Sequence, residues 1–292
     1  PQFIANVGMY GAFNCFPITM TPQGNSIDKT APVTGRMADG KVNFDSWVAG
    51  SIMQDGLVAL WLKESTLTPA AGLTLAMPQS VPLNLEGAGT AASPWLIKTA
   101  SDMVALSQAA VSNSFPGKHF RLAADIDMSQ AQGFVPIGTN KSAFNGTFDG
   151  AGHIISGLSI DAVGYHFQGL FGACYTNSTL KNIIIRRSSL TGDGYYLGLV
   201  AGYSQGVIDN CRVQGDVSGA GLCVGGVVGR SYGTVQRSSF SGSVDAAGYV
   251  GGIAGYSYGA IDACHSDADV SIKVRITDAA SCVGGIAGLA QS

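Results

Sequence analysis

Three pentapeptides in the sequence match the Gly-x-Ser-x-Gly pattern that places the nucleophile of many serine hydrolases. In such enzymes the serine lies on a sharp turn between a strand and a helix and needs a histidine partner. Neither requirement is evident here, and three copies at regular spacing indicate a repeat. We therefore expect an inward-facing serine ladder and no catalytic residue. The three copies are Gly202-Tyr203-Ser204-Gln205-Gly206, Gly229-Arg230-Ser231-Tyr232-Gly233 and Gly255-Tyr256-Ser257-Tyr258-Gly259.

Three aspartates before these pentapeptides, Asp125, Asp127 and Asp149, are a second candidate for chemistry. Clustered carboxylates can bind Ca²⁺ or act on glycans. The alternative is that each carboxylate bonds the amides of its own turn, as the Asp-Gly context of Asp149 suggests. A polysaccharide lyase would also need a basic side chain beside them, and Arg121 is the nearby candidate.

The histidines give no sign of a metal centre. There are four of them, with no His-Glu-x-x-His motif and no Cys-x-x-Cys pair in the sequence. These are the spacings typical of zinc sites. We expect no metal and no cofactor, and we expect His153 to hold a turn.

Tyrosines and one arginine recur at fixed distances after a repeated glycine and form the most useful surface feature. One row follows the glycine by one residue, and a second row, which also contains Gln205, follows it by three. If the strand continues through the glycine, both rows lie on one face, opposite the serines. Tyr and Arg are favoured at recognition surfaces, and aromatic rings suit sugar rings. The alternative is that the rings only stack on one another. The candidate ligand-binding residues are Tyr175, Tyr203, Arg230, Tyr232, Tyr256 and Tyr258.

An internal repeat must position these residues. An apolar pair flanked by glycines recurs five times, and its closing glycines are 30, 27, 26 and 33 residues apart. Between copies, apolar residues recur in register at steps of two, which is the period of a strand. A unit of about 26 residues has room for three short strands and three turns. The pattern predicts a right-handed parallel β-helix in which each repeat is one coil. One predicted row of stacked residues is Leu180, Ile208, Val235 and Ile261.

Composition favours an all-β chain and excludes several classes of protein. Glycine makes up 41 of 292 residues, about twice the usual share. The net charge of −3 comes without runs of Lys or Arg, which argues against a nucleic-acid partner. No apolar run approaches the ~18 residues of a transmembrane helix. The first residues, Pro-Gln-Phe-Ile, lack the basic start of a signal peptide, so we expect any leader to be absent from this sequence.

Residues 85–292 resemble the GLUG-motif family. Gly169-Leu170-Phe171-Gly172 matches the Gly-Leu-x-Gly signature, and the later copies are looser. The preceding segment is similar to the lead-in of such proteins, as at Ser93-Pro94-Trp95-Leu96-Ile97, with Phe134 in place of an expected Trp. The resemblance implies a β-helix and a bacterial secreted or surface protein, often adhesin-like and from Bacteroidetes, or an accessory region of an immunoglobulin-cleaving peptidase. It implies no catalytic residues.

The chain is expected to have two parts. We expect residues 1–82 to form a small antiparallel β-domain that is incomplete at its N-terminus. Hairpin turns are expected at Asp39-Gly40 and Asp55-Gly56. Residues 83–292 read as the β-helix, with a lead-in over 83–166 and repeats over 167–292. A helix over 99–111, capped by Thr99 and Asp102, should shield the first coil. The other end lacks a capping pattern, so end-to-end self-association is expected there.

Six cysteines invite a disulfide framework, but the register argues against it. Cys211 and Cys264 fall in one row two coils apart, with Ser238 between them, and Cys223 and Cys282 fall in another. Two coils at ~4.8 Å each exceed the ~7 Å limit between bridged Cα atoms. We expect small buried residues and no bridges.

These observations favour a non-catalytic extracellular or cell-surface protein that binds a glycan or protein partner in the manner of an adhesin. Two alternatives stay open. One is a polysaccharide-degrading enzyme on the same scaffold, and the other is an accessory region of a larger secreted peptidase. A fold alone does not choose between them.

Overall fold

The computed structural model describes five strands within residues 1–79 and then residues 83–162, 164–272 and 282–291. The chain divides into two compact units, Pro1–Gln79 and Ser80–Ser292.

The described strands of the first unit pair antiparallel. Strands β1 (Gln2–Val7), β2 (Asn14–Thr21) and β3 (Gly24–Ile27) form one sheet in that order. Strand β4 (Trp47–Val48) pairs with β5 (Trp61–Leu62). The turns expected at Asp39-Gly40 and Asp55-Gly56 lie outside the described residues, and a small domain over 1–82 stays a prediction.

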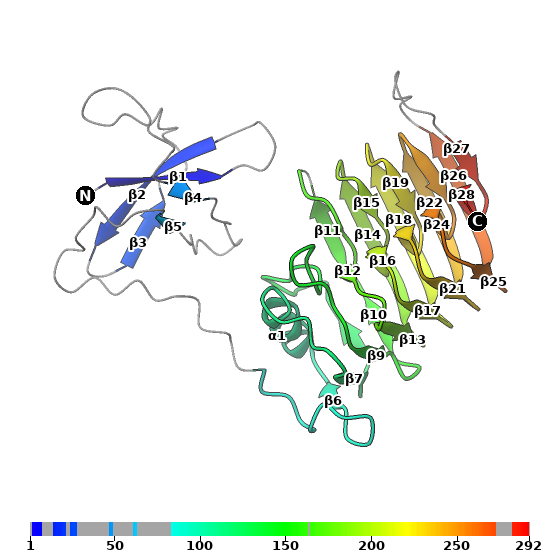
Figure 1. Cartoon of the computed structure of the whole chain (residues 1–292), viewed down its shortest axis with the longest axis horizontal. Coiled ribbons are helices and arrows are strands. Elements are labelled where there is room, and N and C mark those ends of the chain that lie inside the picture. The colour runs from blue at the N-terminus through cyan, green and yellow to red at the C-terminus, as the bar shows by residue number, and fades with distance from the viewer. Residues whose placement is uncertain are drawn as a thin grey trace. The chain divides into compact units, whose positions relative to one another are not determined.

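The second unit is a parallel β-helix, as the repeat predicts, and its strands lie side by side from β6 to β28 (Figure 1). Two of its sheets are long. The first contains β6 (Trp95–Ile97), β7 (His119–Leu122), β9 (Thr147–Asp149), β13 (Thr179–Lys181), β17 (Val207–Asp209), β21 (Thr234–Gln236) and β25 (Ile261–Asp262). The second contains β8 (Ile126–Asp127), β10 (Ile154–Ser156), β14 (Ile184–Gly192), β18 (Arg212–Gly219), β22 (Ser239–Ala246) and β26 (His265–Ile272), with β11 (Ser159–Ala162) also paired to β14.

Two further sheets meet at the glycine-flanked pairs. One contains β12 (Phe171–Cys174), β16 (Ala201–Ser204), β20 (Val228–Ser231), β24 (Ala254–Ser257) and β28 (Ala287–Ala290). The other contains β15 (Tyr196–Leu197), β19 (Cys223–Gly225), β23 (Tyr249–Gly251) and β27 (Cys282–Gly284). A full coil thus has four strands, and the expected three was wrong. The glycine-flanked pair is a corner between two short strands, since only Gly226-Val227 separates β19 from β20.

The predicted rows of stacked side chains are confirmed. Leu180, Ile208, Val235 and Ile261 are successive partners in parallel strands, and the first three have no exposed surface. A second row contains Ile185, Val213, Phe240 and Ser266. Because each inward side chain packs on its equivalents in the neighbouring coils, the core runs the length of the unit.

One helix, α1 (Ala100–Ala109), lies beside the first coils (Figure 1). Thr99 accepts a hydrogen bond from the Asp102 amide, and the Asp102 carboxylate accepts one from the Thr99 amide. This is the predicted capping box, which satisfies two amides that the first helical turn leaves free. Met103 and Leu106 have no exposed surface and belong to the same core as the strands.

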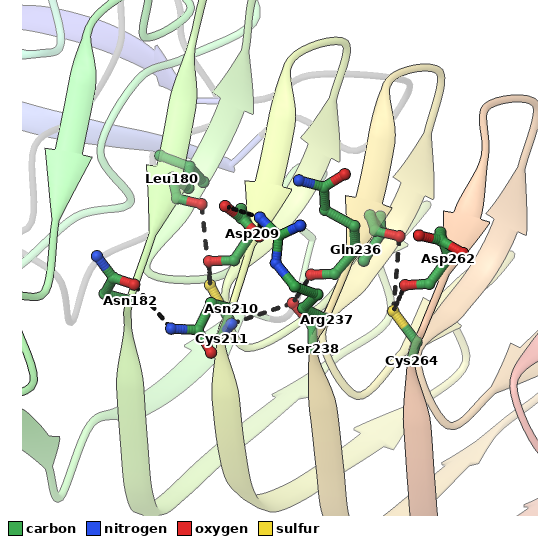
Figure 2. Close-up of polar contacts among 11 residues, drawn as sticks. Leu180, Asn182, Asp209, Asn210, Cys211, Gln236, Arg237, Ser238, Asp262 and Cys264 are labelled. Carbon is green, nitrogen blue, oxygen red and sulfur yellow. Dashed lines mark hydrogen bonds and ion pairs between the residues drawn. The ribbon is translucent and has the colours of Figure 1, made fainter.

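A polar row follows the corner between the two long sheets (Figure 2). Asn182, Asn210, Arg237 and Ala263 all adopt positive φ angles between 48° and 54°, a region that favours Asn among non-glycine residues. Asn210 donates to the Asn182 side-chain oxygen at 2.8 Å, and Arg237 pairs with the Asp209 carboxylate at 2.6 Å. Side chains in successive coils thus bond to one another along this corner.

The serine ladder is confirmed. Ser204, Ser231 and Ser257 are successive partners without exposed surface, and Cys174 extends the row by one coil. Within the described residues five cysteines are free, and the side chain of Cys15 lies outside them. Three of the five are buried, whereas Cys264 and Cys282 are half-buried because no described coil packs beyond theirs. The five are Cys174, Cys211, Cys223, Cys264 and Cys282.

Candidate functional site

The two rows of candidate residues lie on one face, which we call the aromatic face. Tyr203, Arg230 and Tyr256 are successive partners in β16, β20 and β24. The serines stand between the two rows, one residue after the first and one before the second, and they point into the core. Alternation along the strand therefore turns the side chains of both rows outward. The second row continues the pairing, since the Tyr232 amide donates to the Ser204 carbonyl oxygen and the Tyr258 amide to that of Ser231.

The rings of the aromatic face touch from coil to coil. The Tyr203 and Tyr232 centroids are 5.7 Å apart, and those of Tyr232 and Tyr258 are 4.5 Å apart with 11° between the ring planes. Tyr256 lies 4.6 Å from Tyr258. These separations are those of favourable aromatic pairs. The rings therefore stack on one another, as the alternative reading expects, and this stacking orders the surface that faces solvent.

Arg230 lies among the rings. Its guanidinium carbon is 4.9 Å from the centroid of Tyr232 and 5.1 Å from that of Tyr256. Nη1 donates to the Tyr196 hydroxyl at 2.8 Å, and Nη2 donates to the Tyr232 hydroxyl at 2.6 Å. Burial acts to lower the pKa of Arg230, but the hydrogen bond to Tyr196 and the nearby phenol oxygens outweigh it and raise the pKa. The side chain is therefore a permanent cation in an aromatic setting.

The candidate residues differ in exposure. Tyr175, Tyr232 and Tyr258 are exposed by 40%, 43% and 40%, whereas only 7% of Tyr256 is exposed. The Tyr256 hydroxyl donates to the Gln291 side chain, and burial raises the pKa of Tyr256 to about 12. Tyr256 thus supports the exposed rings, and Tyr175, Tyr232 and Tyr258 are the rings that a ligand can reach.

A third row contains Cys223 and Cys282, as the sequence predicts, and adds Tyr196 and Tyr249, which were not among the candidate site residues. Tyr196, Cys223, Tyr249 and Cys282 are partners in the sheet that precedes each corner. Tyr196 lies 6.0 Å from Tyr203, and Tyr249 lies 5.4 Å from Tyr256. The available signal was the position two residues before the opening glycine of each pair, where Phe167 also stands.

The aromatic face encloses a hollow of about 290 Å³. Its lining combines aromatic rings with side-chain amides and one cation. Gln205 donates to the Tyr203 hydroxyl at 2.9 Å, which fixes one of these amides. The lining residues are Asn140, Ala143, Phe167, Ala173, Tyr175, Tyr196, Tyr203, Gln205, Arg230 and Tyr232.

The three aspartates do not converge, and each bonds the amide of a nearby turn or strand. Asp125 accepts from the Ile154 amide, Asp127 from that of Ser129 and Asp149 from that of Ala151. Across residues 83–162, 164–272 and 282–291, no three His, Cys, Asp or Glu side chains are grouped so that they could hold a metal ion.

A second hollow, of about 310 Å³, lies beside Asp125. His153 Nδ1 is 3.2 Å from the Asp125 carboxylate. The basic side chains in the lining are Arg186 and Arg187. Arg121, the basic candidate from the sequence, is the register partner of Asp149 and does not line this hollow.

An irregularity in β14 brings the two arginines to this hollow. The register between β14 and β18 shifts between Ile185 and Ser188, and Arg187 adopts a φ of 49°. An extra residue in one strand re-aims the side chains around it. Periodic spacing gives no signal of such a shift.

The family model described as the GLUG motif matches residues 193–218. This chain carries the GLUG motif. The matched stretch contains β15, β16 and β17 and all but the last residue of β18, so one GLUG motif corresponds to one coil. It includes Tyr196 and Tyr203 of the aromatic face.

Two longer proteins are similar to part of this chain. Halomucin of Haloquadratum walsbyi is 38% identical over 144 residues, which are 46% of this chain and 2% of halomucin. A candidate Gly-rich membrane protein of Evansella cellulosilytica is 33% identical over 136 residues, which are 44% of this chain and 15% of that protein. The chain thus spans only a small part of the relatives it matches.

The chain is also similar to a solved structure. A candidate immunoglobulin A1 protease from Bacteroides ovatus aligns with a TM-score of 0.37 and 17% sequence identity, over 70% of this chain and 86% of that one. Within the described residues, no helix is long and apolar enough to cross a membrane.

Proposed function

We propose that this chain is a non-catalytic binding protein of the cell surface or the extracellular space, adhesin-like in role, and that the aromatic face contacts a glycan or protein partner. The observation that carries the proposal is the set of exposed rings held by stacked coils. About two-fifths of the surface is exposed at each of three tyrosines, Tyr175, Tyr232 and Tyr258. Tyrosine in a folded protein more often buries its aromatic ring and leaves only the hydroxyl in water.

A glycan fits this face better than a protein does. A sugar presents flat apolar C–H surfaces and hydroxyl groups. In the hollow, the tyrosine rings can contact the C–H surfaces, and the amides of Asn140 and Gln205 can bond the sugar hydroxyls. A mostly apolar lining with a few fixed polar groups is the usual composition of a small-ligand site.

The names of the relatives support the proposed location. One is named a mucin and the other a membrane protein. Because the chain spans 2% and 15% of them, a role as one part of a larger surface or secreted protein is included in the proposal. An accessory region of a larger secreted peptidase would be such a part.

A glycan array and a pull-down from host-cell surface extract, each with a matched pair of variants, test the proposal. Tyr175→Ala/Tyr232→Ala removes two exposed rings from the aromatic face. Tyr165→Ala removes a ring that is 57% exposed and outside the lining of the hollow. We expect at least a tenfold loss of binding for the first variant and none for the second. Equal binding by both variants would refute the assignment of the face.

The second hollow favours one alternative, a polysaccharide-degrading enzyme. The Asp125–His153 pair could take a proton, and Arg186 or Arg187 could neutralise an acidic substrate group, which is the combination that the alternative requires. Release of reducing ends or unsaturated sugars from a polysaccharide panel tests it. An activity that His153→Gln abolishes in a folded protein would establish the enzyme, and its absence across the panel would count against one.

A further inference from the structure

The aromatic face contains a cation that a site for neutral sugars does not need. We infer that its ligand is an acidic glycan, whose carboxylate or sulfate group pairs with Arg230 while its ring lies against the exposed tyrosines. The inference rests on the proposed function and names the class of glycan.

The charge of Arg230 has no counter-ion in the described structure. The other groups that act on the guanidinium are the hydroxyls of Tyr196 and Tyr232 and the thiol of Cys223, none of which is a carboxylate. The rings of Tyr256 and Tyr258 lie against it. No carboxylate lies within 4 Å of it among residues 83–162, 164–272 and 282–291. Ring faces offset part of the cost of partly burying the charge. An anionic ligand would offset the rest of the free-energy cost of burying this charge.

Arg230 also retains a donor for a ligand. A guanidinium has five N–H groups. One N–H of Nη1 is used by Tyr196 and one of Nη2 by Tyr232. A third N–H is donated to Tyr258, so one N–H of the two Nη atoms is left to donate to a carboxylate or sulfate oxygen. The tyrosine hydroxyls therefore orient the guanidinium without exhausting it.

The rest of the hollow fits a sugar better than a nucleic acid. Aromatic rings with arginine also suit stacked bases. A nucleic acid, however, carries a phosphate on every nucleotide, and proteins that follow it use several cations. Arg230 is the single cation in this lining, and the chain as a whole has a net charge of −3. One acidic group on a sugar matches one cation.

The first test uses the unaltered protein and compares each acidic ligand with a neutral derivative of the same sugar chain. Oligogalacturonate is measured against its methyl ester, and a sulfated chondroitin oligosaccharide against the desulfated, carboxyl-reduced form. We expect at least tenfold tighter binding of one acidic member, with a preference that shrinks as salt rises from 50 to 500 mM. Equal affinity for acidic and neutral members would overturn the inference and leave glycan binding intact. Binding of no sugar here or on the glycan array would overturn both proposals, and a tighter complex with oligothymidylate would overturn the acidic-glycan inference.

A pair of charge variants locates the effect. Arg230→Gln removes the charge and keeps hydrogen-bond donors, and Arg212→Gln does the same at an exposed arginine of β18. We expect the first variant to lose the preference for the acidic member over its ester, and the second variant to keep that preference. Arg230→Lys should keep part of the preference. Retention of the full preference in folded Arg230→Gln would overturn the inference, and the ligand comparison stands even if that variant does not fold.

Discussion

Cys211 and Cys264 occupy equivalent positions two coils apart, and Ser238 fills that position in the coil between them. The Cys211 amide donates to the Ser238 hydroxyl at 3.1 Å, and the Cys264 thiol donates to the Val235 carbonyl oxygen in the coil of Ser238 (Figure 2). Burial raises the pKa of the Cys211 thiol to about 12, which keeps it protonated and unreactive.

Replacing the intervening serine should allow a bridge to form. Neighbouring coils are about 4.8 Å apart, within the Cα range of disulfides. Under oxidising conditions we expect Ser238→Cys to form one bridge, to Cys211 or to Cys264, visible as a loss of two hydrogens by mass spectrometry. Ser231→Cys is the matched control because it is equally buried and both of its row neighbours are serines. A bridge in the control, or none in Ser238→Cys, would contradict the register.

Gly226 and Gly285 occupy equivalent corner positions and should differ in their tolerance of a methyl group. A Cβ at Gly226 would meet the Phe240 ring and the Gly252 carbonyl oxygen, whereas a Cβ at the equivalent Gly285 would meet nothing within 4 Å. We expect Gly226→Ala to lower the free energy of unfolding by about 3 kcal/mol and Gly285→Ala to leave it within about 0.5 kcal/mol. Urea denaturation measures both. Equal effects would show that crowding by Phe240 and Gly252 is not the cause.

Asp149 should make stability depend on pH in the acid range. Burial acts to raise its pKa, but hydrogen bonds from Asn182 and the Ala151 amide, with Lys181, outweigh burial and lower it. The unfolded chain then binds more protons near pH 4. Stability from this group is therefore complete above its unfolded pKa, ~3.9, and is lost as pH falls through the lower folded pKa.

Removing this carboxylate should flatten that dependence. We expect Asp149→Asn to lower the stability at pH 7 by about 1 kcal/mol and to lose less on going from pH 5 to pH 2 than the unaltered protein does. Asp267→Asn, on the exposed side of β26, serves as the control. An unchanged slope in Asp149→Asn, measured by thermal melts across the range, would refute the assignment.

The tyrosines of the aromatic face should ionise over a wide range of pH. The hydrogen bond with Tyr256 and the charge of Arg230 lower the pKa of Tyr258, and burial raises that of Tyr256 to about 12. Absorbance at 295 nm, where phenolate absorbs, should therefore begin to rise below pH 10 and still rise near pH 12. We expect Tyr258→Phe to remove the early part, and Tyr165→Phe to leave it. An early rise that persists in Tyr258→Phe would assign it to another tyrosine.

Spacing predicted the rows of the fold because each is a matter of counting residues along strands. Ile208 follows Gly202 by six residues and Val235 follows Gly229 by six, and parallel strands place equal counts side by side. The same counting placed Tyr203, Arg230 and Tyr256 in one row. It could not show that Gly226-Val227 turns a corner between two short strands, because counting gives no angle.

That corner explains most of what was missed at the site. Tyr196 and Tyr249 reach Arg230 and Tyr256 from a different sheet, across the turn. The burial of Tyr256 depends on Gln291, which belongs to the following coil. Arg186 and Arg187 reach Asp125 through a shift in strand register that no periodic pattern contains. Counting residues predicted the contacts within a row. Contacts between rows depend on how the chain runs through the corners, which counting does not give.

Because the coils are equivalent, one whole coil can be deleted and the residues on either side still meet in register. Deleting residues 230–255 as a block would join Gly229 to Tyr256, the same dipeptide that Gly255 and Tyr256 form in the native order. Tyr203 would then stack directly beneath Tyr256 on a shortened scaffold that keeps Tyr175, Tyr203, Tyr256 and Tyr258 but loses Arg230 together with Tyr232 and Tyr249.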